Sequence, residues 1–362
     1  MIVTPHVILT AYPQGVQNES EPSGMSPPAA SALPGFRLAY INDFMGSAIP
    51  PGWDVFTGVP GGDPGGQFSP GHVAVKGGML QFSTWPDPAY GGAWVTGGIC
   101  QCGLARTYGA YFVRTRVTGP GPTAVELLWP ATNQWPPEID FSETTGGVTA
   151  SLATIHYGSS NHEDQRELAV RMTTWHTFGV VWTPGQVIYL VDGKVWGTVS
   201  RPTEIPSLAM TLDLQQQTWC LSSWACPSNV QTMQVDWVAE YQLTGPLSVT
   251  VGPFQNDGFS LTSALDDEVS SLAYDVADMH CKSVTVLGYA NPSSTVSQEH
   301  ADSLRRATVV RNRLSADLVA LKVRGVTITA KGLGIADPVG SIKTVAGRAQ
   351  NPRAVGTVCA PT

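Results

Sequence analysis

Three carboxylic acids stand within six residues of one another in the stretch WPPEIDFSETTG, residues 135–146. They are Glu138, Asp140 and Glu143. Side chains at positions i and i+2 of a strand share a face, so Glu138 and Asp140 would point the same way. Glu143 would point to the opposite face of a regular strand. One extra residue around Phe141–Ser142, a β-bulge, returns it to the same face. We therefore expect all three acids on one face of a strand.

Carboxyl groups this close repel one another when ionised, which raises the pKa of at least one of them. A protonated acid beside an ionised carboxylate is the pair that cleaves glycosidic bonds. A solvated strand face or a set of calcium ligands is the alternative, and the pattern E-x-D-x-x-E alone favours neither. Two flat rings just upstream, Trp129 and Trp135, favour the first interpretation, because sugar rings stack on aromatic planes.

The elements that would position these acids are strands. The 362 residues include 38 Gly and 28 Pro, and only 13% are charged, which excludes a coiled coil, a helical bundle and a disordered acidic chain. Short alternating runs fill residues 36–242, for example GAYFVRTRV (109–117) and QVIYLVDGKVWGTV (186–199). Asp192-Gly193 inside the second run predicts a hairpin. With 42% hydrophobic residues and 11 Trp, the sequence predicts an all-β sandwich or jelly roll.

Six blocks of this region resemble glycoside hydrolase family 16, in its laminarinase-like branch, in their order and spacing. They are INDF (41–44), RTYGAYFVRTRV (106–117), LLWPATNQWPPEIDFSE (127–143), TIHYG (154–158), WHTFGVVWTPGQVIYLVDGKVWGTV (175–199) and MQVDWVAEYQ (233–242). The resemblance implies a concanavalin-like jelly roll with the acids on its concave sheet. It also implies a reaction that retains the anomeric configuration and requires no cofactor.

The resemblance assigns a role to each acid: Glu138 is the nucleophile, Asp140 orients it, and Glu143 is the general acid and base. His156 would face Glu143 or Asp140 as a helper, although a lone His is more often packed in a core. Asp236 would help to bind a structural Ca²⁺, with a purely structural role as the alternative. Four tryptophans are candidate sugar platforms, each equally a candidate core residue: Trp94, Trp129, Trp135 and Trp219.

The implied substrates are β-1,3 or mixed β-1,3/1,4 glucans, cleaved internally by a secreted enzyme. Three alternatives stay open on the same fold. A β-galactanase of the agarase or carrageenase type shares the bulged motif. A transglycosylase uses the same nucleophile but passes the glycosyl unit to another sugar. A non-catalytic carbohydrate-binding sandwich would have no need of the paired acids.

The pattern changes after residue 246. Helical spacing of apolar residues predicts helices over 264–279 and 297–321, and strands are predicted over 282–290, 325–334 and 353–360. The charge changes as well: residues 1–245 hold 9 Lys and Arg against 18 Asp and Glu, whereas residues 246–362 hold 11 against 10. We expect a separate, smaller α+β domain, and an acidic front half that excludes nucleic acid as a partner.

This second region resembles the outer-membrane protein A-like domain. The segments that carry the resemblance are VTVLGYAN (284–291), LRRATVVRNRL (304–314), GLGIADPV (332–339) and GRAQNPRAVGTV (347–358). That family binds the diaminopimelate group of peptidoglycan with an Asp and an Arg. The Arg corresponds to Arg306, but Asn291 occupies the Asp position, and Glu299 stands where the family has Asn. Peptidoglycan binding and a stabilising or docking role are both open.

We therefore expect an N-terminal Pro/Ser/Gly-rich segment (1–35), a catalytic domain (36–245) and a C-terminal domain (246–362). Residues 12–34 are a linker or are ordered only by docking. The stretch MIVTPHVILTAYPQG lacks Lys and Arg, which makes it a poor signal peptide, and no apolar run is long enough to span a membrane.

Six Cys indicate disulfides and an extracellular or cell-envelope location. The expected pairs are Cys220–Cys226 and Cys281–Cys359. A third pair, Cys100–Cys102, is less expected, because positions i and i+2 of a strand rarely bridge.

Overall fold

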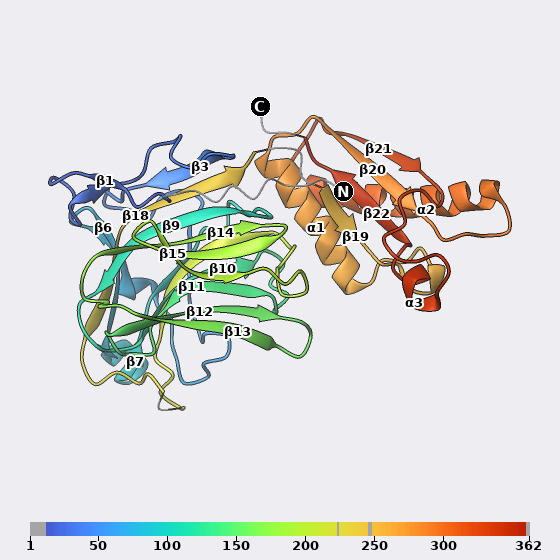
Figure 1. Ribbon diagram of the computed structural model, residues 1–362. Helices are drawn as coiled ribbons and strands as arrows, with labels where there is room; N and C mark the ends of the chain where they lie inside the picture. Colours follow the sequence, from blue (N-terminus) through green and yellow to red (C-terminus); the bar gives the residue numbers. More distant parts are fainter. Residues whose placement is uncertain (1–11, 223, 245–247, 360–362) are drawn as a thin grey trace. The chain divides into compact units, whose positions relative to one another are not determined.

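The computed structural model describes residues 12–222, 224–244 and 248–359. The chain divides into two compact units (Figure 1). The first holds most of the chain up to Leu243, and the second holds Thr244 onward together with Ala105–Thr107 and Ser207–Ala209. Residues 1–11, on which the signal-peptide expectation rests, lie outside the described residues. Within the described part, no helix combines the length and the apolar character needed to cross a membrane.

The first unit is a sandwich of two sheets whose named strands pair antiparallel. The seven-stranded sheet has the order β13-β12-β11-β10-β17-β8-β4. Its strands are β4 (Asp54–Val55), β8 (Gly98–Cys100), β10 (Thr123–Pro130), β11 (Glu138–Glu143), β12 (Ala150–Tyr157), β13 (His162–Ala169) and β17 (Met210–Gln217). The sandwich expected from the alternating runs is confirmed.

The nine-stranded sheet has the order β16-β15-β14-β9-β18-β6-β5, with β3 paired to β18 and β7 paired to β6. Its strands are β3 (Phe36–Asn42), β5 (Val73–Lys76), β6 (Met79–Asp87), β7 (Ala93–Val95), β9 (Gly109–Val117), β14 (His176–Thr183), β15 (Gln186–Val191), β16 (Lys194–Val199) and β18 (Gln231–Leu243). Short 3-10 helices η1 (Pro70–His72) and η2 (Pro88–Tyr90) flank β5 and β7.

Alternate residues of the two sheets meet in one apolar core. Leu212 and Leu214 of β17 pack there with Leu128 of β10 and with Ile139 and Phe141 of β11. Burying a side chain of this size stabilises a fold by roughly 1.5–3 kcal/mol. The residues between them on each strand must therefore point to the other face of the seven-stranded sheet.

The hairpin predicted at Asp192-Gly193 joins β15 to β16. Asp192 has φ 47° and Gly193 has φ 74°. Two consecutive positive φ values are what a tight primed turn needs, because its twist matches that of the flanking strands. The prediction is confirmed.

Residues 12–35, here called the strap, pack on the outer face of the nine-stranded sheet. They form a two-stranded sheet of β1 (Val16–Gln17) and β2 (Met25–Ser26). Tyr12 and Leu33 are buried in a second apolar cluster with Phe112, Trp237 and Tyr241 of the sheet. The tract is thus ordered by docking, which is one of the two states expected for it.

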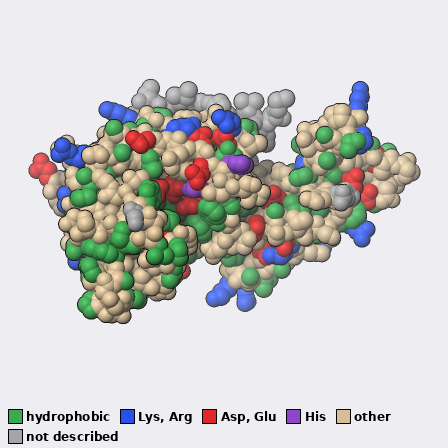
Figure 2. Space-filling model, turned by 90° about the horizontal axis from the view of Figure 1, so that it is seen from below, with side chains coloured by type: hydrophobic (Ala, Val, Ile, Leu, Met, Phe, Trp, Pro, Cys, Tyr) green, Lys and Arg blue, Asp and Glu red, His purple; other side chains and the backbone are tan. Residues whose placement is uncertain are grey.

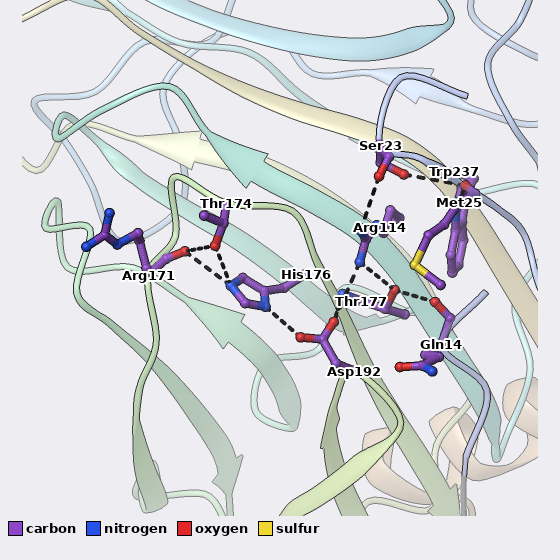
Figure 3. A network of polar contacts seen from close by, with 10 residues as sticks. All are labelled: Gln14, Ser23, Met25, Arg114, Arg171, Thr174, His176, Thr177, Asp192 and Trp237. Carbon is purple, nitrogen blue, oxygen red and sulfur yellow. Dashed lines mark hydrogen bonds and ion pairs between the residues drawn. The ribbon is translucent and has the colours of Figure 1, made fainter. Parts of the chain in front are cut away.

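Polar contacts hold the strap to the sheet (Figure 3). The Trp237 indole donates to the Met25 carbonyl at 2.8 Å, and the Thr177 hydroxyl donates to the Gln14 carbonyl at 2.8 Å. Arg114 donates to the Ser23 carbonyl at 3.4 Å. Each contact satisfies a backbone carbonyl of the strap.

The outermost strand of the seven-stranded sheet, β13, is an edge with the sequence HEDQRELA. Four of its eight side chains carry charge: Glu163, Asp164, Arg166 and Glu167. Its exposed residues alternate with partly buried ones, so one backbone edge and a charged surface face solvent.

The second unit is a four-stranded sheet of order β19-β22-β20-β21 with helices α1, α2 and α3. Its elements are β19 (Ser248–Val251), η3 (Gln255–Asp257), α1 (Ser263–Asp278), β20 (Ser283–Tyr289), α2 (Val296–Ala320), β21 (Thr327–Gly332), α3 (Val345–Arg348) and β22 (Arg353–Thr357). Strands β20 and β21 are parallel, and β22 is antiparallel to β20 and β19. The expected helices and strands are present, with β19 and α3 in addition.

Helix α2 lies unusually close to the sheet in this unit. A Cβ at Gly288 of β20 would collide with the carbonyl oxygen of Ser303, and one at Gly332 of β21 would meet the His300 carbonyl and the Leu304 backbone nitrogen. Glycine is therefore required at both positions for the helix to pack on the strands.

All six cysteines are paired: Cys100–Cys102, Cys220–Cys226 and Cys281–Cys359. The first pair departs from the expectation. Two residues in regular strand geometry rise by roughly 6.6 Å. Cys100 ends β8 and Cys102 lies in the turn that follows, so their Cα atoms are 5.1 Å apart. The turn makes the bridge feasible.

Candidate active site

The bulge expected in the acidic strand is present. Asp140 pairs with Thr154, and Glu143 pairs with Leu152, so three steps along β11 match two along β12. Glu138 and Asp140 alternate with the core residue Ile139, and the bulge brings Glu143 back to their side. We call this side of the seven-stranded sheet the carboxylate face.

Rows of side chains cross the carboxylate face, because residues opposite one another in paired strands point the same way. The middle row spans all seven strands. Its members, in order from β13 to β4, are Gln165, Thr154, Asp140, Leu127, Asp213, Cys100 and Asp54. The row on one side contains His156 and Glu138, and the row on the other side contains Glu143. The three acids thus lie in three adjacent rows.

Close contacts orient these groups. The Trp135 indole donates to Glu138 Oε2 at 2.6 Å. His156 Nε2 lies 3.4 Å from Asp140 Oδ2, and its Nδ1 lies 2.9 Å from Asn161 Oδ1. An amide oxygen only accepts hydrogen bonds, so Nδ1 carries a proton and Nε2 faces Asp140. Acidic side chains and histidine gather toward the middle of the face seen in Figure 2.

Burial and mutual repulsion raise the pKa of all three acids. Burial, and then the charge of Asp140, hold the pKa of Glu138 well above its usual range. Burial, and then the charge of Glu143, do the same for Asp140. For Glu143, burial and the charge of Glu138 raise the pKa to about 7. Burial and mutual repulsion therefore favour the protonated forms of these three acids, which titrate as one interacting group.

Two of the four candidate tryptophans lie beside these acids. Trp129 follows Leu128, the partner of Ile139, so the register places it next to Glu138. Trp135 is 43% exposed and donates a hydrogen bond to Glu138. The other two lie on other elements: Trp94 is in β7, paired to β6 of the nine-stranded sheet, and Trp219 follows β17.

Asp213 of β17 is another acid on the carboxylate face, and the sequence analysis did not single it out. Alternation in TLDLQQQ predicts that Asp213 points away from Leu212 and Leu214. The sequence does not reveal that β17 is next to β10, two strands from the acidic strand. Strand order, which sets this proximity, comes from long-range pairing.

Asp236 lies in β18 of the other sheet, and its surroundings fit a calcium ion. Its carboxyl is fully buried, and burial raises its pKa to about 6. Oδ2 accepts from the Ser23 backbone at 3.1 Å, whereas Oδ1 is buried without a hydrogen-bond partner. Glu21 Oε2 of the strap is likewise buried and unpartnered, and its charge acts on Asp236. These two oxygens would hold Ca²⁺, with carbonyls and water completing the six to eight ligands it usually takes.

Two further groups of side chains have ligand atoms close enough together to hold a metal ion. Glu138, Asp140 and His156 bring ligand atoms within 4.8 Å of one another, but they belong to the acid cluster already described. Asp54 is equally close to Cys100 and Cys102, whose sulfurs are bonded to each other and offer no thiolate.

The residues singled out in the second unit lie around one turn. Arg306 is 1% exposed and donates to three carbonyls, those of Asp257, Gly258 and Tyr289. The Asn291 amide donates to Asp257 Oδ1 at 2.9 Å. The Asp257 side chain is 57% exposed and lies 3.4 Å from Arg306. Arg306 therefore fixes the turn from beneath, and the carboxylate of Asp257 faces solvent.

Comparison with known proteins adds independent information. Residues 80–239 match the family model of glycosyl hydrolases family 16, over less than half of the chain. An endo-1,3-1,4-β-glycanase of Rhizobium meliloti (strain 1021) is 27% identical over 107 residues, which are 28% of this chain and 23% of that protein. The chain thus matches less than a quarter of the length of this curated relative.

Solved structures share the fold of the sandwich. The laminarinase from Rhodothermus marinus is 20% identical with a TM-score of 0.50, covering 59% of this chain and all of that one. A non-specific endo-β-1,3(4)-glucanase is 19% identical with a TM-score of 0.51, covering 65% of this chain and 97% of that one. The matched segment holds the acidic strand, its neighbours and most of both sheets. Residues 80–239 of the first unit are therefore similar to the glycosyl hydrolases family 16, and the first unit shares the fold of these structures.

Proposed function

We propose that the first unit is an endo-acting glycoside hydrolase that cleaves β-1,3 or mixed β-1,3/1,4 glucans with retention of configuration. The observation that carries the proposal is the bulge in β11, which places Glu143 on the same face as Glu138 and Asp140. Two carboxyl groups on one face, in different contacts, are what a double-displacement mechanism needs.

The contacts support a division of roles. Glu138 accepts the Trp135 indole hydrogen bond, which stabilises its ionised form. It would attack the anomeric carbon and form a glycosyl–enzyme bond. Glu143, whose pKa is about 7, would donate its proton to the leaving glycosidic oxygen. Water would then attack the anomeric carbon while Glu143 removes its proton, and Glu138 would be released.

Asp140 and His156 would set the charge of this pair. Asp140 lies between the two catalytic rows, and its negative charge would oppose ionisation of Glu138. The His156 Nε2, 3.4 Å from Asp140 Oδ2, would orient the Asp140 carboxyl group while Glu138 changes from carboxylate to ester and back.

The choice of glucan rests on the names of similar proteins, a β-1,3-1,4-glycanase among the relatives and β-1,3-glucanases among the structures. The aromatic residues Trp129 and Trp135 beside the acids would stack on the apolar faces of glucosyl rings. The middle row of side chains crosses the whole sheet and continues on both sides of the acids. A polymer could therefore lie across it and be cleaved internally.

Product analysis tests the proposal. The purified chain is incubated with laminarin, barley β-glucan, agarose and carrageenan, and released oligosaccharides are separated. We expect products from the first two, and loss of at least 10³-fold in rate for Glu138→Gln with unchanged thermal unfolding. Glu167→Gln, an exposed acid opposite Leu152 on the same face, is the matched control and should retain activity. Products from agarose or carrageenan alone would show that the substrate is a galactan and not a glucan. Full activity of Glu138→Gln would exclude Glu138 as the nucleophile.

We further propose that the second unit resembles the outer-membrane protein A-like domain in function and holds the enzyme to peptidoglycan. The solvent-facing carboxylate of Asp257, 2.9 Å from the Asn291 amide, supports this role. It supplies the negative charge that Asn291 lacks, and Arg306 acts by positioning it. An extracellular or cell-envelope location agrees with three disulfides, which persist in oxidising compartments.

A further inference from the structure

Asp213 stands in the same row of the carboxylate face as Asp140. The register runs from Asp140 to Leu127 of β10 and from Leu127 to Asp213 of β17. Adjacent strands are roughly 4.8 Å apart, so the two acids are separated by about 10 Å. Asp213 is therefore close to the acids that carry the proposed chemistry, but two strands from the attacking oxygen. It is placed to contact a sugar beside the one that reacts.

The surroundings of Asp213 limit what its carboxyl group can do. It is 5% exposed, and its row neighbours are the apolar Leu127 and the disulfide-bonded Cys100. The Thr211 hydroxyl donates to Oδ1 at 2.9 Å and is the one hydrogen-bond partner of this carboxyl among the described residues. Oδ2 is left for a ligand lying on the face. A lone partner is too little to stabilise a buried carboxylate ion.

The charges that act on Asp213 point the same way. Glu138 is the ionisable group whose charge acts on Asp213. Asp140 and Asp54 stand in the same row as Asp213, one on either side of it. Burial raises the pKa of Asp213 well above its usual range, the Thr211 hydrogen bond lowers it in part, and Glu138 raises it again. Lys and Arg are absent from the middle row as the structure describes it. Burial and the charge of Glu138 thus both favour the uncharged form of this carboxyl group.

We infer that Asp213 is a substrate-positioning residue whose carboxyl group donates a hydrogen bond to a hydroxyl of the glucan, in the subsite next to the cleaved bond. A neutral acid can donate where a carboxylate can only accept. Asp213 is buried among apolar neighbours, where a hydrogen bond is stronger than in water. Removing this hydrogen bond should therefore weaken glucan binding. This inference rests on the proposed glucan substrate and adds a specificity contact to it.

Binding measured without turnover tests the inference. The parent protein carries Glu138→Gln, and its affinity for laminarihexaose, a β-1,3-linked glucose hexamer, is measured by calorimetry. Adding Asp213→Ala should raise Kd about tenfold, the value of one buried hydrogen bond. Adding Asp213→Asn, which keeps the size and a donor, should leave Kd within about twofold. An unchanged Kd for Asp213→Ala would overturn the inference, as would an equal loss in Asp213→Asn.

A second measurement separates a hydrogen-bond role from a merely structural one. As pH rises, the parent should lose more affinity than the Asp213→Asn form, because its donor becomes an anion beside the sugar whereas the amide does not titrate. Asp140 and Glu143 titrate in both forms, so the ratio of the two Kd values is the readout. A ratio that stays constant across the pH range would overturn the inference. Because the comparison uses the isosteric variant, it holds even where Asp213→Ala fails to fold.

The outcomes also separate this inference from the proposed function. If laminarin is hydrolysed and the Kd of Asp213→Ala is unchanged, the Asp213 contact is excluded and the proposed hydrolase function stands. If hexaose binding depends on Asp213 but the protein hydrolyses nothing, the contact stands and the hydrolase function is excluded. A parent that does not bind the hexaose would overturn both.

Discussion

Glu138 and Glu143 are both buried carboxyl groups, yet their contacts give them different tasks. Glu138 accepts a 2.6 Å hydrogen bond from the Trp135 indole, which favours the anion. For Glu143, burial and the charge of Glu138 raise the pKa to about 7. In a coupled set, the proton resides where the anion is least stabilised. Glu138 is the member of the pair whose anion receives a hydrogen bond, as suits a nucleophile, and Glu143, with a pKa of about 7, can give up and regain a proton near neutral pH, as a general acid and base requires.

The pH dependence of kcat/KM should report this proton. Glu143 is active when protonated, and because its pKa is raised to about 7, the active form is lost as pH rises through that value. We therefore expect kcat/KM on laminarin to fall about tenfold for each pH unit above 7. Initial rates from pH 4 to 9 measure the profile.

An activated aryl β-glycoside is the matched control for this profile. Its phenolate leaves without a proton, so bond cleavage no longer needs the acid, and the decline above pH 7 should disappear from the first chemical step. If both substrates show the same decline, the ionisation belongs to another group, and Glu143 is not the acid.

At the residue level, the sequence was informative where the chemistry is local. The spacing of Glu138, Asp140 and Glu143 predicted a bulge, and the register shift in β11 confirms it. Asp213 and Asn161 were not predicted to belong to the site, because they reach it through strand order and through a turn that ends beside His156. Neither feature leaves a signal in a short stretch of sequence.

The strap is the element whose contribution is easiest to isolate. Its apolar anchors, Tyr12 and Leu33, cover Phe112, Trp237 and Tyr241 on the outside of the nine-stranded sheet. Without the strap these aromatic side chains would face water, which is unfavourable by roughly 25 cal/mol per Å² of apolar surface. The strap is thus part of the folded sandwich, although it lies on the side away from the acids.

Truncating one anchor should destabilise the sandwich without touching catalysis. Leu33 is 1% exposed, so Leu33→Ala should lower the free energy of unfolding by about 3 kcal/mol through lost burial and a cavity. Denaturant unfolding followed by tryptophan fluorescence measures the change. Val16→Ala, at a strap residue 54% exposed, is the control and should change it by less than about 0.5 kcal/mol. A fall in kcat with unchanged stability would contradict this account.

Elements were predictable where periodicity is strong. The helices over 264–279 and 297–321 correspond to α1 and α2, and Asp192-Gly193 forms the expected hairpin turn. Strand β19 was not predicted, because four residues give too short an alternation. The Cys100–Cys102 bridge was less expected because it depends on a chain that leaves the strand at once, which the residue types alone do not indicate.

At the scale of the whole molecule, the two units divide the work in the proposed function. The first unit carries the acid cluster. The second unit carries the turn at Asp257, whose exposed carboxylate is contacted by Arg306 and Asn291. Arg306 and Asn291 contact Asp257 from below, so a ligand at this turn would meet Asp257 first. Attachment to an insoluble wall would raise the local concentration of enzyme near its polymer.

Sedimentation with purified peptidoglycan tests the second unit in the full chain. We expect the protein to pellet with the wall, and Asp257→Asn to weaken binding at least tenfold, because a charge-assisted contact with an ammonium group is lost. Asp337→Asn, another exposed acid of this unit, is the control and should pellet normally. Equal sedimentation of all three would exclude Asp257, and absence from every pellet would leave this unit without a wall ligand.

The charged edge strand β13 has a consequence for how copies of this protein behave at high concentration. An open edge is a template on which another chain can add a strand and begin an aggregate. Along HEDQRELA, pairing with a second copy of the same edge would place charged side chains, three of them acidic, beside one another in neighbouring strands. The edge therefore resists self-association. A chain in which these charges were replaced by apolar residues would be prone to form insoluble fibrils.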